Sequence, residues 1–178
     1  HERSWEELLR RPMIMELSTF TDPDTKALAV LFILYRLMSS AHQLFAHDPG
    51  RMHLTVVEEA HRVLKDRQPS QHPDVADTQS AMVDEFANAL SEVRYAGEGL
   101  IILDQMPGKL SPAVRANTNM KMAHRLPEEE QQRCLSQAAG LSAEQQRILY
   151  RLPPGEGLWF PPDGGVHHIH VPLFEKKH

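Results

Sequence analysis

The sequence predicts an α/β fold in which a mostly parallel sheet is flanked by helices. Three observations predict it: short apolar runs alternate with longer segments of helical periodicity, two apolar runs end in polar residues, and the composition is globular. Hydrophobic residues make up 41% of the 178 residues and charged residues 24%, so the chain can bury a core of its own.

The N-terminal part is expected to contain two strands and one long helix. Residues 12–17 are a short apolar run that predicts the first strand. The capping residues 21–24, with a proline near the first helical position, predict a helix that continues to about Leu44. Its uncharged stretch, residues 27–35, is about half as long as a bilayer crossing requires, so we expect a buried helix. Residues 52–58 predict the second strand.

The middle of the chain continues the alternation. Residues 65–77 are polar and contain two prolines, which predicts a loop. Residues 77–96 carry apolar side chains at helical spacing, and the glycines of residues 97–99 end this helix. The apolar run 100–104 predicts a third strand, and residues 120–124 predict a fourth.

The C-terminal part is expected to add helices and a hairpin. Residues 127–139 and 142–150 predict two modest helices separated by a glycine. Residues 157–160 and 166–172 predict two antiparallel strands, because a Pro-Pro-Asp-Gly-Gly turn lies between them.

Charge and cysteine content exclude some classes of protein. The formal net charge of −5 gives no large basic field, so binding to nucleic acid by charge alone is not expected, although a few cations facing a pore could still bind it. The single cysteine, Cys134, excludes an internal disulfide and a four-cysteine zinc site and fits a reducing cytoplasm. No secretion signal is visible at the N-terminus, and we expect a cytoplasmic protein.

The second predicted strand ends in two adjacent acids. In the segment LTVVEEAHRVL, residues 54–64, four apolar positions are followed at once by Glu58 and Glu59. Both carboxylates should therefore lie at the carboxyl edge of a parallel sheet, which is where open α/β folds bind ligands. On an extended segment the two side chains point in different directions, so one can face a metal and the other a reacting water.

This segment resembles the Walker B segment of HerA-like and VirB4-like ATPases, which belong to the HerA/FtsK type of P-loop motor. The resemblance implies that Glu58 helps to hold Mg²⁺, although the first acid of that segment is more usually an aspartate. It implies that Glu59 polarises the water that attacks the γ-phosphate of ATP. The alternative is that the two glutamates only begin a helix, where their charge suits the helix dipole.

The stretch from residue 91 to residue 126 resembles the same family throughout. An arginine precedes an aromatic-small-glycine turn, and an apolar strand then ends in a polar residue and a glutamine. The resemblance implies that Gln105 senses the γ-phosphate or its water, for which an amide that both donates and accepts is suited. It implies that Arg94 is an arginine finger that reaches a neighbouring subunit's nucleotide, with Arg115 and Arg125 as competing candidates.

One part of the family's pattern is missing. The sequence contains no G-x-x-x-x-G-K-[ST] loop, on which phosphate binding in this class depends. The expectation is therefore an incomplete RecA-like P-loop fold without its Walker A strand, with a core over residues 1–126 and a helical pair plus hairpin over residues 127–178. The chain alone should neither bind ATP tightly nor hydrolyse it.

Three functions remain open. The first is the C-terminal part of a motor ATPase that uses ATP and Mg²⁺, assembles as a homo-oligomeric, hexameric ring, and moves DNA or drives a nuclease or other effector, with no membrane partner. The second is a non-catalytic assembly module that keeps the fold. The third is a metal-dependent hydrolase that combines Glu58 and Glu59 with the cluster His167, His168 and His170.

Overall fold

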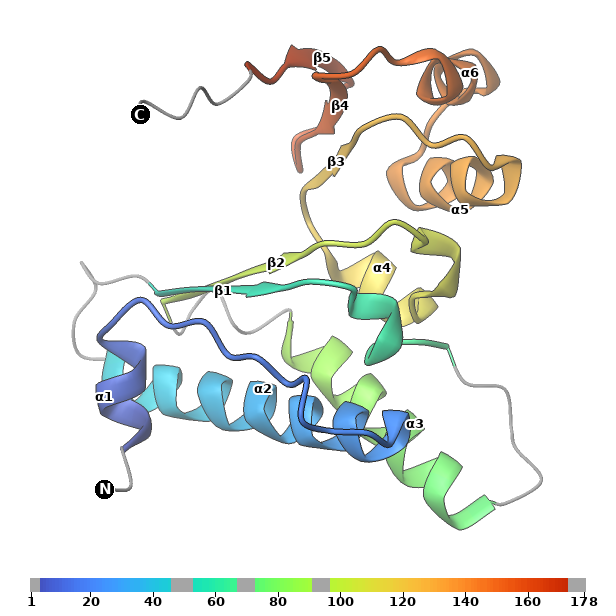
Figure 1. Ribbon diagram of the computed structural model, residues 1–178. Coiled ribbons are helices and arrows are strands. Elements are labelled where there is room, and N and C mark those ends of the chain that lie inside the picture. The colour runs from blue at the N-terminus through green and yellow to red at the C-terminus, as the bar shows by residue number, and fades with distance from the viewer. Residues whose placement is uncertain (1–3, 46–52, 67–72, 91–96, 173–178) are drawn as a thin grey trace. The chain divides into compact units, whose positions relative to one another are not determined.

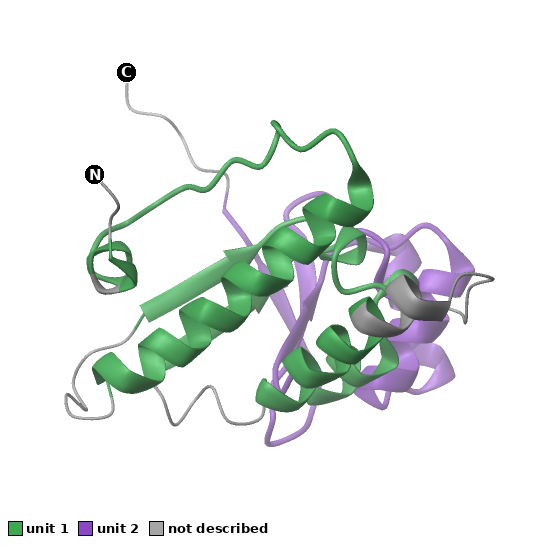
Figure 2. Ribbon diagram, turned by 90° about the horizontal axis from the view of Figure 1, so that it is seen from below, with its two compact units in different colours: residues 1–104, 109–117 green, residues 105–108, 118–178 purple. Residues whose placement is uncertain are grey.

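The computed structural model describes residues 4–45, 53–66, 73–90 and 97–172 (Figure 1). The chain divides into two compact units, one formed by residues 1–104 and 109–117 and the other by residues 105–108 and 118–178 (Figure 2). The sequence predicts a different division, into a core over residues 1–126 and a helical pair plus hairpin over residues 127–178. That division stays a prediction.

The first unit contains a pair of parallel strands with helices packed against it. Its elements in chain order are α1 Trp5–Leu9, α2 Pro23–Phe45, β1 His53–Val57, the 3₁₀ turn η1 Ala60–Arg62, α3 Pro73–Ala89, β2 Glu98–Ile102 and α4 Pro112–Asn117. The strands β1 and β2 pair in parallel from His53 opposite Glu98 to Val57 opposite Ile102. The predicted α/β class with parallel strands and flanking helices is thus confirmed.

Within the described residues of the first unit, helices cover one face of the strand pair. Helices α2 and α3 lie on the same side of β1 and β2 (Figure 1), and the core there joins Leu31 and Leu34 of α2 to Val57 and Phe86. The opposite face carries apolar side chains that are 40–57% exposed in the structure, namely Leu54, Val56, Ile101 and Leu103. Within the described residues, β1 and β2 pair only with each other.

The long helix α2 begins as the sequence predicts. The Asp22 side chain accepts a hydrogen bond of 2.7 Å from the backbone N–H of Thr25, and Pro23 is the first helical residue. Hydrogen bonding from Thr25, through its side chain first and its backbone second, lowers the pKa of Asp22 below its usual value. Burial is confined to one face of α2, since Phe32 and Tyr35 are each 57% exposed.

By length and composition alone, α2 could also cross a membrane. The core helix of a soluble protein passes the same test, and α2 buries a regularly spaced set of side chains in the first unit. These buried residues are Ala27, Leu31, Leu34, Leu37, Ala41 and Phe45.

Two expectations for the first unit are wrong. Residues 12–17 form no strand, and Ile14 is 89% exposed. A short apolar run becomes a strand only where a neighbour accepts its hydrogen bonds, and β1 and β2 do not pair with it. The helix α3 begins at Pro73, a residue suited to the first helical turn, and not at Asp77. Its predicted end at residue 96 lies outside the described residues.

The second unit is a three-stranded antiparallel sheet with two helices. Its elements are β3 Lys121–Ala123, α5 Glu129–Ala139, α6 Ala143–Arg151, β4 Glu156–Phe160 and β5 His167–His170, and the short turn η3 Pro107–Lys109 lies where the chain passes back to the first unit. The strand order is β3-β4-β5, so the predicted fourth strand finds its hydrogen-bonded neighbour in β4. Apolar side chains of Ala123, Leu135, Leu149, Leu158 and Phe160 form its core with Leu152.

Candidate functional site

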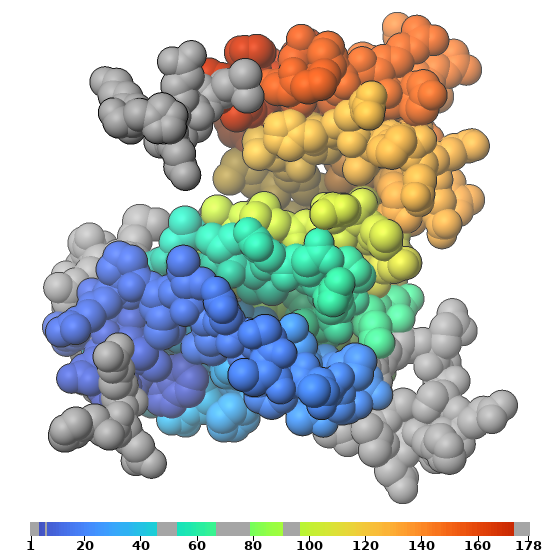
Figure 3. Space-filling model, viewed as in Figure 1, coloured from blue at the N-terminus to red at the C-terminus, as the bar shows by residue number. Residues whose placement is uncertain are grey.

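The candidate site lies at the carboxyl edge of β1 and β2. Because the strands are parallel and in register, Val57 and Ile102 end them at the same edge. The pairing continues one step further, since the Leu103 N–H donates to the Val57 carbonyl at 2.9 Å and the Ala60 N–H donates to the Leu103 carbonyl at 3.3 Å. In Figure 3 the surface of β1 and the turn after it (teal) adjoins that of the segment that contains β2 (yellow-green).

The two predicted acids differ in backbone conformation. Glu58 is exposed, and Glu59 adopts φ 52° and ψ 41°, in the left-handed region. No other non-glycine residue in the described part of the chain has a positive φ. The expectation that both acids lie on one extended segment is therefore wrong, because the chain turns sharply at Glu59. A non-glycine residue held there costs about 1 kcal/mol or more, so the surrounding structure must impose it.

The carboxylate of Glu59 remains accessible. Its side chain is 43% exposed, and its Oε2 lies 3.4 Å from Nε of Arg62, which is 67% exposed. An ion pair this exposed contributes little to stability. Glu59 precedes the three-residue turn η1 and makes no capping hydrogen bond with its side chain, so the acids do not begin a long helix.

A histidine and an aspartate join the two strand ends. The Asp104 carboxylate accepts a hydrogen bond from the backbone N–H of His61, and its Oδ2 and Oδ1 lie 3.0 and 3.2 Å from His61 Nδ1. The Asp104 side chain is 4% exposed and that of His61 17%. This pair was not predicted from the sequence, although both residues belong to segments that end at the predicted edge.

The other predicted site residues lie in other parts of the chain. Arg94 lies outside the described residues. Gln105 is exposed and belongs to the second unit, as does Arg125, while Arg115 lies in α4 of the first. The role of each stays a prediction.

The donor set at the edge fits magnesium. Glu58 and Glu59 supply accessible carboxylate oxygens, the ligand type that Mg²⁺ prefers, and one exposed carboxylate is enough because this ion keeps several of its waters. No group of three His, Cys, Asp or Glu residues that could hold a metal ion by protein ligands alone occurs in the described ranges.

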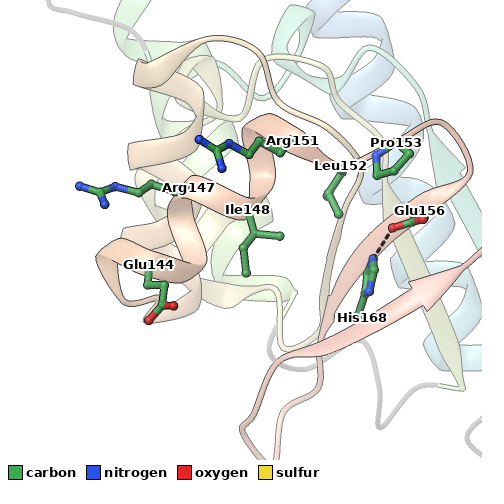
Figure 4. A pocket seen from close by; sticks show the side chains of 8 residues that line it. All are labelled: Glu144, Arg147, Ile148, Arg151, Leu152, Pro153, Glu156 and His168. Carbon is green, nitrogen blue, oxygen red and sulfur yellow. Dashed lines mark ion pairs between the residues drawn. The ribbon is translucent and has the colours of Figure 1, made fainter.

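A hollow of about 450 Å³ lies within the second unit beside α6, β4 and β5 (Figure 4). Its charged groups do not converge: Glu156 pairs with His168 at 2.6 Å, whereas Arg147 and Arg151 point away from that pair. Of the predicted histidine cluster, His168 is thus held by a carboxylate at a largely exposed site. We assign no ligand to this hollow.

Open α/β folds bind ligands at the carboxyl edge of their parallel strands, and the acids of this chain follow β1 at that edge. Two solved structures share the fold of this chain. The genome packaging NTPase B204 from Sulfolobus turreted icosahedral virus 2, solved with AMP, has a TM-score of 0.64 at 18% identity, over 97% of this chain and 73% of B204. VirB4 of Thermoanaerobacter pseudethanolicus has a TM-score of 0.62 at 20% identity, over 89% of this chain and 40% of VirB4.

A third similar structure is B204 from Sulfolobus Turreted Icosahedral Virus, a DNA-packaging ATPase, with a TM-score of 0.57 at 23% identity over 80% of this chain and 62% of that protein. No protein-family model and no curated protein matches the sequence. At these identities the likeness concerns the fold alone: this chain folds like the B204 NTPases and VirB4, as the resemblance led us to expect, and the missing Walker A strand stays a prediction.

Proposed function

We propose that this chain is the later part of the ATP-hydrolysing domain of a P-loop motor. The observation that carries the proposal is the position of Glu58 and Glu59, which follow β1 at the edge where β2 also ends. The likeness in fold to B204 supports it, because that NTPase was solved with AMP, AMPPCP and ATP-gammaS.

Each acid has a distinct role in the proposal. Glu58, exposed at the strand end, holds Mg²⁺ directly or through its waters. The metal supplies charge neutralisation for the phosphates of the substrate ATP. Glu59 orients the attacking water and accepts its proton, for which an accessible carboxylate at a fixed position is required.

Two further residues complete the proposed chemistry. Gln105 contacts the γ-phosphate or the attacking water, since its amide can donate to the phosphate and accept from the water. Arg94 acts as a finger toward the nucleotide of a neighbouring subunit, where a permanently charged guanidinium stabilises the transferring phosphoryl group. Arg115 and Arg125 are the alternatives for this role.

The residues that bind the triphosphate are proposed to lie outside this chain. A RecA-like fold holds the triphosphate with the backbone amides and lysine of its phosphate loop, and this sequence has no such motif. The proposal therefore assigns that loop and its strand to a region outside these 178 residues, and the chain alone is not expected to bind ATP tightly.

The proposed partners follow from the fold likeness and not from composition. B204 is a genome-packaging protein, which supports a homo-oligomeric motor that acts on DNA. We propose a hexameric ring in the cytoplasm, with a nuclease or another effector as a further partner. With a net charge of −5, contact with DNA would have to come from a few cations that face a pore.

The second candidate is a non-catalytic assembly module. The observation that favours it is the missing phosphate loop, without which an ATPase fold can still mediate contacts between subunits. A phosphate loop encoded upstream in the gene favours the motor, and a gene without one favours the module.

The decisive experiment measures Mg²⁺-dependent ATP hydrolysis by the longest natural form of the protein and by the 178-residue chain. We expect turnover in a form that carries a phosphate loop and none in the chain by itself. Turnover in the chain by itself that disappears in Glu59→Gln would show that the phosphate grip is not needed and would overturn the proposed division. Absence of turnover in the long form would leave the assembly module.

A further inference from the structure

The strained backbone of Glu59 is held from both sides by the end of β2. On one side the Leu103 N–H donates to the Val57 carbonyl at 2.9 Å, and on the other the Ala60 N–H donates to the Leu103 carbonyl at 3.3 Å. Ala60 is fully buried, which pins the residue directly after Glu59. The turn therefore cannot relax to an extended path without breaking bonds to β2.

Asp104 adds two contacts to His61, the second residue after Glu59. Its carboxylate accepts from the backbone N–H of His61 and lies 3.0 Å from the ring nitrogen Nδ1 of the same residue. An ionised carboxylate only accepts, so these contacts are both hydrogen bonds when Nδ1 carries a proton. One side chain of β2's continuation thus fixes both the backbone and the ring of the residue two positions after Glu59.

The burial of this pair separates it from an ordinary surface contact. The Asp104 side chain is 4% exposed and His61 17%, whereas the Glu59 side chain beside them is 43% exposed. A buried, bidentate contact next to an accessible carboxylate is the arrangement in which a supporting group sets the position of a reacting one.

We propose that Asp104, acting through His61, is a positioning residue that holds Glu59 in the left-handed conformation in which it works. The inference rests on the proposed role of Glu59. Asp104 also directly precedes Gln105 in the chain, so the same contact ties the turn of Glu59 to the segment that leads into the candidate sensor. A shift of the β2 end would then move the water-activating carboxylate.

The first test uses stability and needs no ATP. Glycine adopts positive φ without strain, so Glu59→Gly should melt about 2–4 °C above Glu59→Ala, two variants that both lack the carboxylate. In an Asp104→Ala background this difference should fall to less than half, because the turn then keeps its backbone bonds to Leu103 but not the contact with Asp104, and can relax more easily. A difference that persists unchanged would overturn the inference.

The second test uses turnover in an ATP-hydrolysing form of the protein. Asp104→Ala should lower kcat by about 10–100-fold while KM for ATP changes by less than about twofold, since it acts through another residue. His61→Asn, which keeps a donor near the position of Nδ1, should retain most activity, and His61→Leu should lose about tenfold. If Asp104→Ala does not fold, the comparison of His61→Asn with His61→Leu still tests the positioning role.

The two failures are distinguishable. If Glu59→Gln does not impair turnover, the proposed function itself fails. If Glu59→Gln abolishes turnover while Asp104→Ala and His61→Leu leave kcat unchanged, only the positioning role is overturned. Glu98→Gln, at the opposite end of the strands, serves as the matched control and should leave kcat unchanged below its melting temperature.

Discussion

Two histidine–carboxylate pairs occupy the opposite ends of the same two strands. At the amino end, Glu98 of β2 lies 2.7 Å from His53 Nδ1 and accepts a hydrogen bond of 2.6 Å from Thr55. At the carboxyl end, Asp104 bonds His61. Burial does not tell them apart, because the acid side chains are 1% and 4% exposed.

What differs is the backbone beside each pair. At the amino end all three partners lie in regular strands, and both oxygens of Glu98 are taken by side chains of β1. At the carboxyl end the pair adjoins a left-handed residue and two accessible acids. A buried histidine–carboxylate pair therefore marks a candidate site only where it supports strain next to an accessible reactive group.

The largest expected effect is a loss of ATP turnover that occurs on mutation at the carboxyl end of the strands and not at the amino end. Glu59→Gln keeps the size of the side chain but removes the base, so ATP turnover should fall by about 10²–10⁴-fold in a form that hydrolyses ATP. Nucleotide binding should persist, as measured by fluorescence of a labelled ATP analogue. Glu98→Gln provides the matched amide change, and an equal loss of turnover in both variants would break the comparison.

The next effect should separate the ends by stability. Glu98→Ala removes a carboxylate on which His53 and Thr55 both depend, and we expect a loss on the order of 3 kcal/mol in the free energy of unfolding. Denaturant titration followed by circular dichroism measures it. Glu156→Ala is the control, because its pair with His168 is 29% and 59% exposed and should contribute less than about 1 kcal/mol. Similar losses in the two variants would contradict a stabilising role of Glu98 toward His53 and Thr55.

A smaller effect concerns the metal. If Glu58 holds Mg²⁺, Glu58→Gln should raise the Mg²⁺ concentration needed for half-maximal turnover by about tenfold, while saturating Mg²⁺ restores most of the rate. A magnesium titration of initial rates tests this. An unchanged midpoint would show that Glu58 does not bind Mg²⁺, and Glu59 would then be the remaining acid of the pair.

The smallest effect sharpens the assignment at the amino end. Thr55→Val keeps the side-chain shape and removes one of the hydrogen bonds to Glu98, so it should cost about 1.5 kcal/mol and less than Glu98→Ala. Thermal and denaturant unfolding measure the loss, and turnover should not change. A larger loss than in Glu98→Ala would mean that packing, and not the carboxylate, stabilises this end.

Local patterns located most of the elements near the strand pair. Strand β1, residues His53–Val57, lies inside the predicted run 52–58, and the acids follow it as expected. Strand β2 begins at Glu98, earlier than predicted. A glutamate between two glycines looks like a turn by itself, and only its partners His53 and Thr55 on the neighbouring strand make it a buried strand residue.

The sequence by itself determined that two apolar runs alternate with helices and that Glu58 and Glu59 stand at the end of one of them. Periodicity and composition act over a few neighbouring residues, so a single sequence displays them. Tertiary structure alone decided that residues 12–17 stay unpaired, that Glu59 turns to positive φ, and that Asp104 meets His61. Each of these depends on hydrogen bonds between segments far apart in the chain, and such bonds exist only once the strands have paired.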